Sequence, residues 1–195
     1  MAIIASGPSA RSAGVGELKS RIPVVAIKRN VELAPWADAV YGCDFPWWRS
    51  VQGLPAYPGR KWAHDQRACD RYGARKVKVA IDANALMFDE TGHVGSGGNS
   101  GFHALNLVAQ LGADRILLVG FDVHDRAGVH WYGRNTALGM SNPMESNFRR
   151  WRGAFETAAR QLSERGVQVI NASPISDIKG FERADLGEAL GAWGL

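Results

Sequence analysis

The residues best suited to chemistry in this sequence lie between positions 95 and 130. A glycine-rich loop and a helix-forming segment lead to an apolar run that ends before Asp122, with His124 and His130 shortly after it. A carboxylate can accept a proton, and an imidazole can donate or accept one near neutral pH. Proton transfer by these three side chains is therefore the first chemistry to consider. The Asp122 carboxylate could instead shape the loop by accepting backbone N–H groups.

The glycine-rich loop precedes a helix that we expect to begin at Asn99 or Ser100 and to end at Gly112. Either polar residue can cap a helix, and glycine suits the position after a helix end. Free N–H groups at such a helix start attract an anion, most readily a phosphate. The loop lacks the lysine of a P-loop and has Ser100 in place of the third glycine of a GxGxxG motif. A plain connector without a ligand stays open as the alternative.

Strands and helices are expected to alternate along the chain. The apolar run Ile116–Phe121 predicts a parallel strand covered on both faces. Further strands are expected at Ala2–Ala5, Pro23–Ile27, Ala37–Cys43, Val77–Ile81 and Val167–Ile170. Further helices are expected at His64–Tyr72, within a loop-rich insertion over residues 53–73, at Glu145–Arg165 and at Ala184–Leu190. This alternation predicts an α/β fold: a single Rossmann-like domain over residues 1–195, with a mostly parallel sheet and helices on both faces.

Candidate nucleotide-binding residues follow the ends of the first three predicted strands, where ligands bind in parallel sheets. The first strand leads into a small-residue turn whose glycine lets a ligand approach the backbone: Ser6, Gly7, Pro8 and Ser9. The second is followed by two cations and an amide that suit phosphate and ribose, or are solvated surface groups: Lys28, Arg29 and Asn30. The third delivers Asp44 and a group of aromatics that could wall a base or fill the space beneath a loop.

The connector over residues 123–147 is long and irregular, as active-site lids and binding loops often are. Four side chains in or next to it carry nitrogen and oxygen atoms that bind divalent ions: Asp122, His124, Asp125 and His130. Their spacing matches no strong metal signature, so we predict no metal site.

Composition limits the class of protein. The 195 residues are 46% hydrophobic and 22% charged, which suits one well-buried domain. The N-terminal segment is too short for a signal peptide, and no apolar run approaches the ~18 residues of a membrane span. We therefore expect a cytoplasmic protein, with Cys43 and Cys69 as reduced thiols. The net charge of +4 suits an anionic ligand: a nucleotide, a nucleic acid or an acidic sugar.

Four motifs occur in an order that resembles a known family. They are IIASGPSA at the N-terminus, Ser100-Gly101, LGADRILLVGFD and VQVINASPIS. Together they resemble the small bacterial sialyltransferases that build lipooligosaccharides, and more closely a phage-encoded group with the same framework. More distantly, the chain is similar to the 6-hydroxymethylpterin diphosphokinase-like proteins, which share the GPS turn and a G-[FI]-D strand end. A phage-encoded member would act in the cytoplasm of the bacterial host.

The resemblance to the sialyltransferases implies roles position by position. Their first turn contacts the cytidine nucleotide and corresponds to residues 6–9, with Ser6 where the family has asparagine. Two further family asparagines fall at Lys28 and near Cys43 or Asp44, and the serine at the helix start is Ser100. Two tyrosines that steady the leaving phosphate correspond to His124 and His130. Residues 141–147 hold no histidine, although the family's general base lies there.

Transfer from a nucleotide-activated sugar requires that the leaving phosphate is neutralised and that the acceptor hydroxyl is deprotonated. We assign the first task to His124 and His130, aided by the helix start at Asn99 and Ser100. The second falls to Asp122 or to one of the same histidines. A glycosyltransferase-like enzyme of this kind requires no cofactor, and the sequence identifies neither its acceptor nor its oligomeric state.

Two alternatives stay open. A diphosphokinase-like enzyme would need Mg²⁺ bridging the nucleotide phosphates, with carboxylates such as Asp44 and Asp122 as its ligands. A non-catalytic phage protein could instead bind nucleic acid through a basic surface and exposed tryptophans, with an affinity that falls steeply as salt rises.

Overall fold

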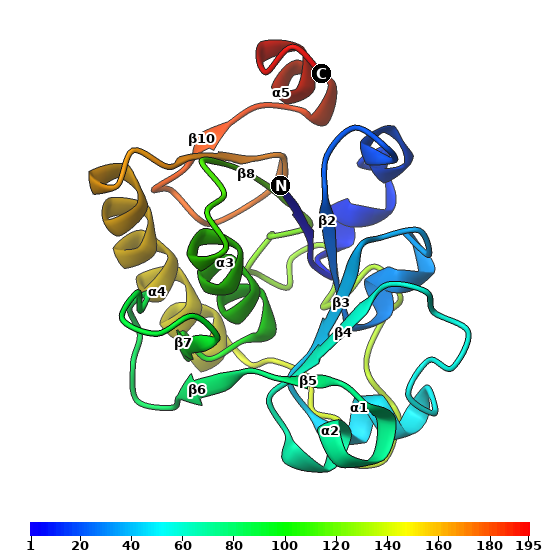
Figure 1. Cartoon of the computed structure of the whole chain (residues 1–195). Coiled ribbons are helices and arrows are strands. Elements are labelled where there is room, and N and C mark those ends of the chain that lie inside the picture. The colour runs from blue at the N-terminus through cyan, green and yellow to red at the C-terminus, as the bar shows by residue number, and fades with distance from the viewer.

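Eight short strands form one fully parallel sheet in the computed structural model, which describes residues 1–195 (Figure 1). The strands are β1 (Ala2–Ile4), β2 (Val24–Ile27), β3 (Ala39–Gly42), β4 (Arg60–Ala63), β5 (Arg75–Lys76), β8 (Arg115–Val119), β9 (Gln168–Asn171) and β10 (Glu182–Arg183). Their order in the sheet is β10-β9-β8-β1-β2-β3-β4-β5. The chain therefore builds outward from β1 in one direction and from β8 in the other, and the strand order reverses between these two strands. The predicted Rossmann-like α/β fold is confirmed.

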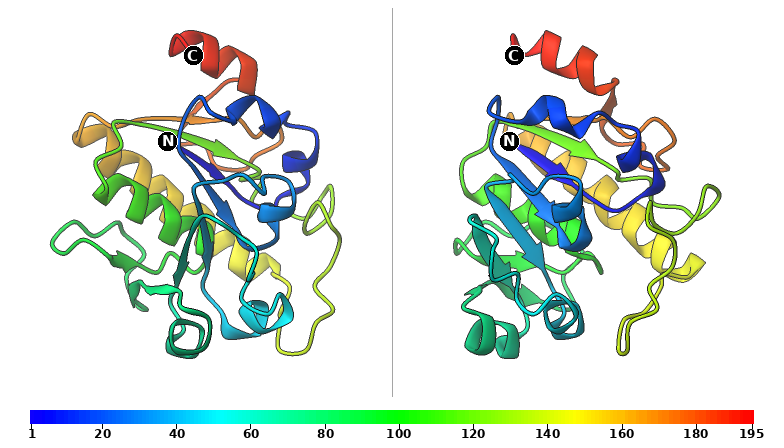
Figure 2. Two further views of the ribbon diagram at one scale, coloured as in Figure 1. Left: turned by 45° about the vertical axis from the view of Figure 1, so that its right-hand side comes forward. Right: turned by 90° about the vertical axis from the view of Figure 1, so that its right-hand side faces the viewer.

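Helices cover both faces of the sheet (Figure 2). On one face, side chains such as Ile3, Val25 and Tyr41 pack against α3 (Ser100–Gln110) and α4 (Glu145–Glu164). On the other, the alternate residues of the same strands pack against η1 (Pro8–Arg11), η2 (Val15–Leu18), α1 (Phe45–Ser50), α2 (Gln66–Tyr72) and α5 (Leu186–Ala192). The short helix η3 (Lys28–Glu32) follows β2 directly. None of the helices combines the length and apolar composition that crossing a membrane requires.

Strand β8 shows why a continuous apolar run predicts a parallel strand that is covered on both faces. Ile116 and Leu118 belong to the core on the α3 face, whereas Leu117 and Val119 belong to the opposite core, and all four are fully buried. A strand in the middle of a parallel sheet has no solvated face, so these four positions are all apolar, and only Arg115 at the start of the strand is exposed.

Two segments differ from the expectation. Residues 53–73 contain β4, which pairs in register with β3 through Tyr41 and Trp62. Only the last two residues of this strand are apolar, which left its sequence pattern too short to recognise. The aromatic residues after Asp44 form α1, and both Trp47 and Trp48 are buried in the core, so they fill space rather than wall a ligand.

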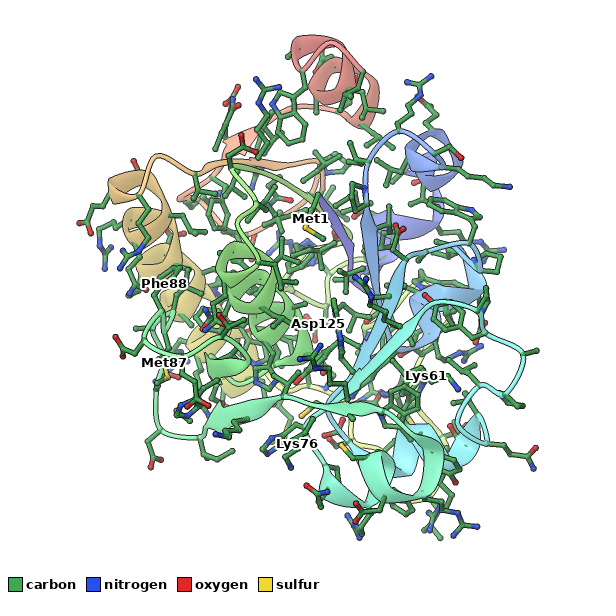
Figure 3. The ribbon with its side chains drawn as sticks, viewed as in Figure 1. Met1, Lys61, Lys76, Met87, Phe88 and Asp125 are labelled. Atoms are coloured by element: carbon green, nitrogen blue, oxygen red, sulfur yellow. The ribbon has the colours of Figure 1, made fainter.

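The segment between β5 and α3 lies outside the main sheet. It forms a parallel pair, β6 (Lys78–Ala80) and β7 (His93–Gly95), joined by a loop that carries Met87 and Phe88 beside α4 (Figure 3). The Asn106 side chain on α3 accepts hydrogen bonds from the N–H groups of Met87 and Gly95, both at 2.9 Å. This bonding fixes the glycine-rich loop that leads into α3.

Candidate functional site

A cavity of about 440 Å³ lies at the carboxyl edge of the sheet. Its wall is formed by the ends of β1, β2, β3 and β8, the start of α3, the connector after β8 and the start of α4. It lies where the strand order reverses between β1 and β8, which is the place where open α/β sheets bind ligands. Nine residues of the predicted site line it: Ser6, Gly7, Lys28, Asp44, Asn99, Ser100, Asp122, His124 and His130.

The turn after β1 is fastened to the end of β8 by Asp122. One carboxylate oxygen accepts the Ser9 N–H at 2.9 Å, and the other accepts the Ser9 hydroxyl. Asp122 is 1% exposed, and a Cβ atom on Gly7 would lie only 2.6 Å from its carboxyl carbon, so this close approach requires glycine. Because both oxygens have partners, the geometry favours the loop-shaping role of Asp122 over proton transfer.

Three predicted nucleotide-binding residues do not line the cavity. Pro8 begins η1, and the Ser9 hydroxyl points to Asp122. Asn30 is fully buried; its amide donates to the Ile27 carbonyl at 2.6 Å and its side-chain oxygen accepts from the Trp131 indole at 2.9 Å. Asn30 therefore anchors the connector to the end of β2 instead of contacting a ligand.

His130 lies in the cavity with its ring half-buried. Its Nδ1 is 2.9 Å from the Ser6 hydroxyl, and its ring stacks on Tyr132 with centroids 4.9 Å apart. Burial, together with the nearby Lys28 ammonium, lowers the pKa of His130 from 6.5 to about 4. The ring is therefore neutral near pH 7, the state in which an imidazole can both donate and accept a hydrogen bond.

His124 is held by backbone groups on both ring nitrogens. Its Nε2 donates to the Ile175 carbonyl, and its Nδ1 accepts from the Arg126 N–H at 3.2 Å. The side chain is 5% exposed and joins the connector to the segment after β9. Proton transfer through His124 would require breaking a bond to the backbone. The ring nitrogens of His130 face the side chains of Ser6 and Asn135, which can rotate away, so His130 is the better placed of the two histidines.

The start of α3 offers unpaired N–H groups to the cavity. Asn99 caps the helix as predicted, since its side chain accepts the Phe102 N–H at 2.9 Å. The N–H groups of Ser100 and Gly101 donate to no acceptor within the protein. The Trp151 indole holds the preceding turn by donating to the Gly98 carbonyl at 2.9 Å. Two free donors at the positive end of an 11-residue helix form a favourable place for an anion.

Lys28 and Asp44 form an ion pair in the cavity. Burial raises the pKa of the Asp44 carboxyl, but the Lys28 ammonium outweighs it, so the pKa lies below its ordinary value. Lys28 has a φ of +50°, a left-handed conformation that costs a residue other than glycine roughly 1–3 kcal/mol. A partly exposed ion pair contributes only ~0–1 kcal/mol. The pair alone does not offset the backbone strain.

His103 is a cavity residue that the sequence reading missed. Its Nδ1 is 2.8 Å from the Tyr41 hydroxyl, while its Nε2 is buried without a hydrogen-bond partner. Burial, and next the neighbouring His64, lower its pKa from 6.5 to about 3. The position three residues after Ser100 puts both side chains on one side of the helix, a spacing that could have identified it.

The connector supplies a second set of missed residues. Neutral amide and hydroxyl side chains line the outer wall of the cavity: Asn135, Ser141, Asn142 and Asn147. Beside them stand Tyr132 and Trp151, and the Arg29 guanidinium lies 4.2 Å from the Tyr132 ring centre. The segment extends to α1, where Arg49 donates to the Leu138 carbonyl at 3.2 Å (Figure 2). The sequence of this segment has no hydrophobic periodicity, so only its length predicted a role in an active site or in binding.

The groups that could bind a metal ion are dispersed. No set of three or more histidine, cysteine, aspartate or glutamate side chains lies together in the structure. Asp44 and Asp122, the candidate ligands of a magnesium ion, are each engaged with another residue. Cys43 lines the cavity as a free thiol, and burial raises its pKa to about 12.

No family model, curated protein sequence or solved structure matches this chain. The geometry and charges of the cavity are therefore the basis for the functional assignment, together with the short sequence motifs.

Proposed function

We propose that this protein is a glycosyltransferase-like enzyme that binds a nucleotide-activated sugar in the cavity, with a cytidine nucleotide as the first candidate. The observation that carries the proposal is the pair of free N–H groups at Ser100 and Gly101, which lie beside a cavity that also contains Lys28. Backbone donors and an ammonium group in one concave site at a strand-order reversal suit a phosphate.

The charges around the cavity support an anionic ligand. Asp44 and Asp122 are the carboxylates that line it, and each already has a partner. Arg150 lines it as well and forms no ion pair; its Nε donates to the Asn84 side chain at 2.9 Å. The uncompensated positive charge therefore favours a phosphate over a neutral ligand.

The outer wall suits a sugar. Asparagine side chains both donate and accept hydrogen bonds, which matches the mixed hydrogen bonding of sugar hydroxyls. Asn135, Asn142 and Asn147 line this wall, and the Trp151 ring provides an apolar surface among them. Bonds within the protein hold the three amides in place and use only part of their donor and acceptor capacity. A site with a phosphate-binding inner part and this outer wall fits a sugar joined to a nucleotide.

The chemistry assigned to the site is displacement at the sugar carbon that carries the phosphate. The acceptor oxygen forms a bond to that carbon, the carbon–oxygen bond to phosphate breaks, and its electron pair leaves with the phosphate. The acceptor's proton must pass to a base, and neutral His130 is suited to accept it or to hydrogen-bond the leaving phosphate. His124 and Asp122 hold the cavity wall in place.

A thermal-shift screen tests the proposal. Cytidine, uridine, guanosine and adenosine mono-, di- and triphosphates are each added with EDTA or with Mg²⁺. A ligand at one hundred times its dissociation constant stabilises the native state by about 2.7 kcal/mol. At about 2–4 °C per kcal/mol, this raises the Tm of a chain of this size by roughly 5–10 °C.

We expect a metal-independent shift with cytidine or uridine nucleotides. A shift confined to purine triphosphates with Mg²⁺ would overturn the proposal in favour of a diphosphokinase-like enzyme. No shift with any nucleotide, together with salt-sensitive binding of DNA, would make the protein a nucleic-acid-binding protein instead.

A further inference from the structure

The backbone of Lys28 has a strained conformation, and the turn after β2 does not itself require a lysine at this position. It follows the last residue of β2 and begins η3 with a φ of +50°. Glycine or asparagine adopts this left-handed conformation at much lower cost. The lysine side chain extends to the Asp44 carboxylate in the cavity.

Asp44 also departs from the local rule for its position. It stands before the first residue of α1 with extended backbone angles, which is the position of a helix cap, yet its side chain accepts no hydrogen bond from the helix. The other three Asx residues before helices of this chain do accept one: Asp65 before α2, Asn99 before α3 and Asp185 before α5. Of these four residues, only Asp44 does not cap its helix, and its carboxylate pairs with Lys28 instead.

The ion pair does not explain these two departures. The side chains of Lys28 and Asp44 are 24% and 50% exposed, and ion pairs in such surroundings stabilise a fold only slightly. No charged neighbour adds to the stability of the pair. Burial raises the pKa of Tyr41 and Cys43 and lowers that of His103, so all three side chains are neutral. Neighbouring residues inside a cavity that both depart from the usual backbone or capping preferences are typically functional residues.

We propose that Lys28 and Asp44 form an exchangeable ion pair that recognises the phosphoribosyl part of a nucleotide. This inference rests on the proposed function. When the nucleotide enters, the Lys28 ammonium exchanges the carboxylate for a phosphate oxygen, and the freed Asp44 carboxylate accepts a hydrogen bond from a ribose hydroxyl.

The two side chains have complementary capacities that fit this ligand. An ammonium group only donates hydrogen bonds, and an ionised carboxylate only accepts them. A ligand that presents an anionic oxygen near a hydroxyl group satisfies both. A ligand that has the phosphate but lacks the hydroxyl leaves Asp44 without a donor, and a site built to bind a hydroxyl discriminates strongly against such an analogue.

Calorimetric titration with cytidine 5′-monophosphate and its 2′,3′-dideoxy analogue tests the pair. The wild-type protein is expected to bind the ribonucleotide at least about tenfold more tightly, which corresponds to about 1.4 kcal/mol. In Asp44→Ala the preference falls to less than twofold. The matched control is Asp70→Asn, which alters an exposed carboxylate on α2 outside the cavity and keeps the wild-type preference.

A second variant tests the strain at Lys28. Lys28→Gly is expected to melt at or above the wild-type temperature and to bind the ribonucleotide at least tenfold more weakly. The inference is overturned if Asp44→Ala keeps the full preference for the ribonucleotide, or if the wild-type protein shows none. It is equally overturned if Lys28→Gly binds as the wild type does. Failure of the wild type to bind either nucleotide would instead count against the proposed function itself.

Discussion

The two ends of the cavity use their polar side chains in different ways. At the end formed by β8 and the segment after β9, which we call the fastened end, hydrogen bonds within the protein occupy the side chains of Asp122 and His124. At the end formed by β2 and β3, which we call the open end, polar groups lack a partner, bond only to other side chains, or have costly conformations. Its members are Lys28, Asp44, His103 and His130.

This difference separates structural from functional residues among side chains that follow strand ends. A buried polar group without a partner, such as His103 Nε2, costs stability in the free protein. A ligand can remove such a cost by supplying the missing partner. The open end is therefore where we expect substrate, and the fastened end is where we expect mutations to act on stability.

His130 should show the largest effect at the open end. Loss of a general acid or base typically lowers turnover by about 10²–10⁴-fold. His130→Ala is therefore expected to lower release of cytidine monophosphate from a cytidine-activated sugar at least a hundredfold, with little change in the Tm. His93→Ala, which alters a histidine on β7 outside the cavity, serves as the control. An active and stable His130→Ala protein would remove His130 from the mechanism.

Asp122 should show the largest stability effect, at the fastened end. Asp122→Ala leaves the Ser9 N–H and hydroxyl buried without an acceptor, and two such losses cost about 2–6 kcal/mol. Asp44→Ala removes only a partly exposed ion pair, which contributes less than ~1 kcal/mol. Urea unfolding with an unchanged m-value measures both. Equal losses in the two variants would mean that the two ends do not differ in this way.

The buried histidines predict how stability depends on pH. The folded pKa of His103 is about 3, below its ordinary 6.5, so the unfolded chain binds more protons as the pH falls below about 6.5. Stability therefore falls between pH 6.5 and pH 3, and His103 accounts for about 2 kcal/mol of the loss by pH 5. His130 acts in the same direction.

The variant His103→Gln isolates this contribution. The measurement is the free energy of unfolding at pH 7.5 and at pH 5 in the variant and the wild type. The variant should lose less stability between the two pH values. An identical decrease in the two proteins would show that His103 titrates normally and is not held neutral by burial.

The sequence predicted the fold best where hydrophobic patterns were long. Strand β8, apolar from Ile116 onward, and the long amphipathic α4 were recognisable, whereas β5 and β10 have two residues each and no pattern of their own. Strand β4 is placed by its partner β3 rather than by its own sequence. Pairing between distant segments decides such strands, and a single sequence does not display it.

The position of the cavity and part of its lining could be predicted from the sequence. Strand ends and a capped helix start meet at one edge in any parallel sheet, so Ser6, Lys28 and Ser100 were identifiable. The directions of the side chains could not be predicted, because they depend on the turn that follows each strand. The Asn30 side chain points into the core, and that of Ser9 points toward Asp122. His103 resembled a core residue, since it lies on the buried side of an apolar helix.

Amide resonances of Ser100 and Gly101 give the most direct test of nucleotide binding at this edge. Their N–H groups are free in the structure, so a bound phosphate should shift both proton signals downfield on titration with cytidine 5′-monophosphate in EDTA. The Phe102 N–H, already bonded to Asn99, should move less. Saturable shifts at Ser100 and Gly101 are the predicted result. Unchanged signals at both residues, while other parts of the protein respond, would contradict the central claim.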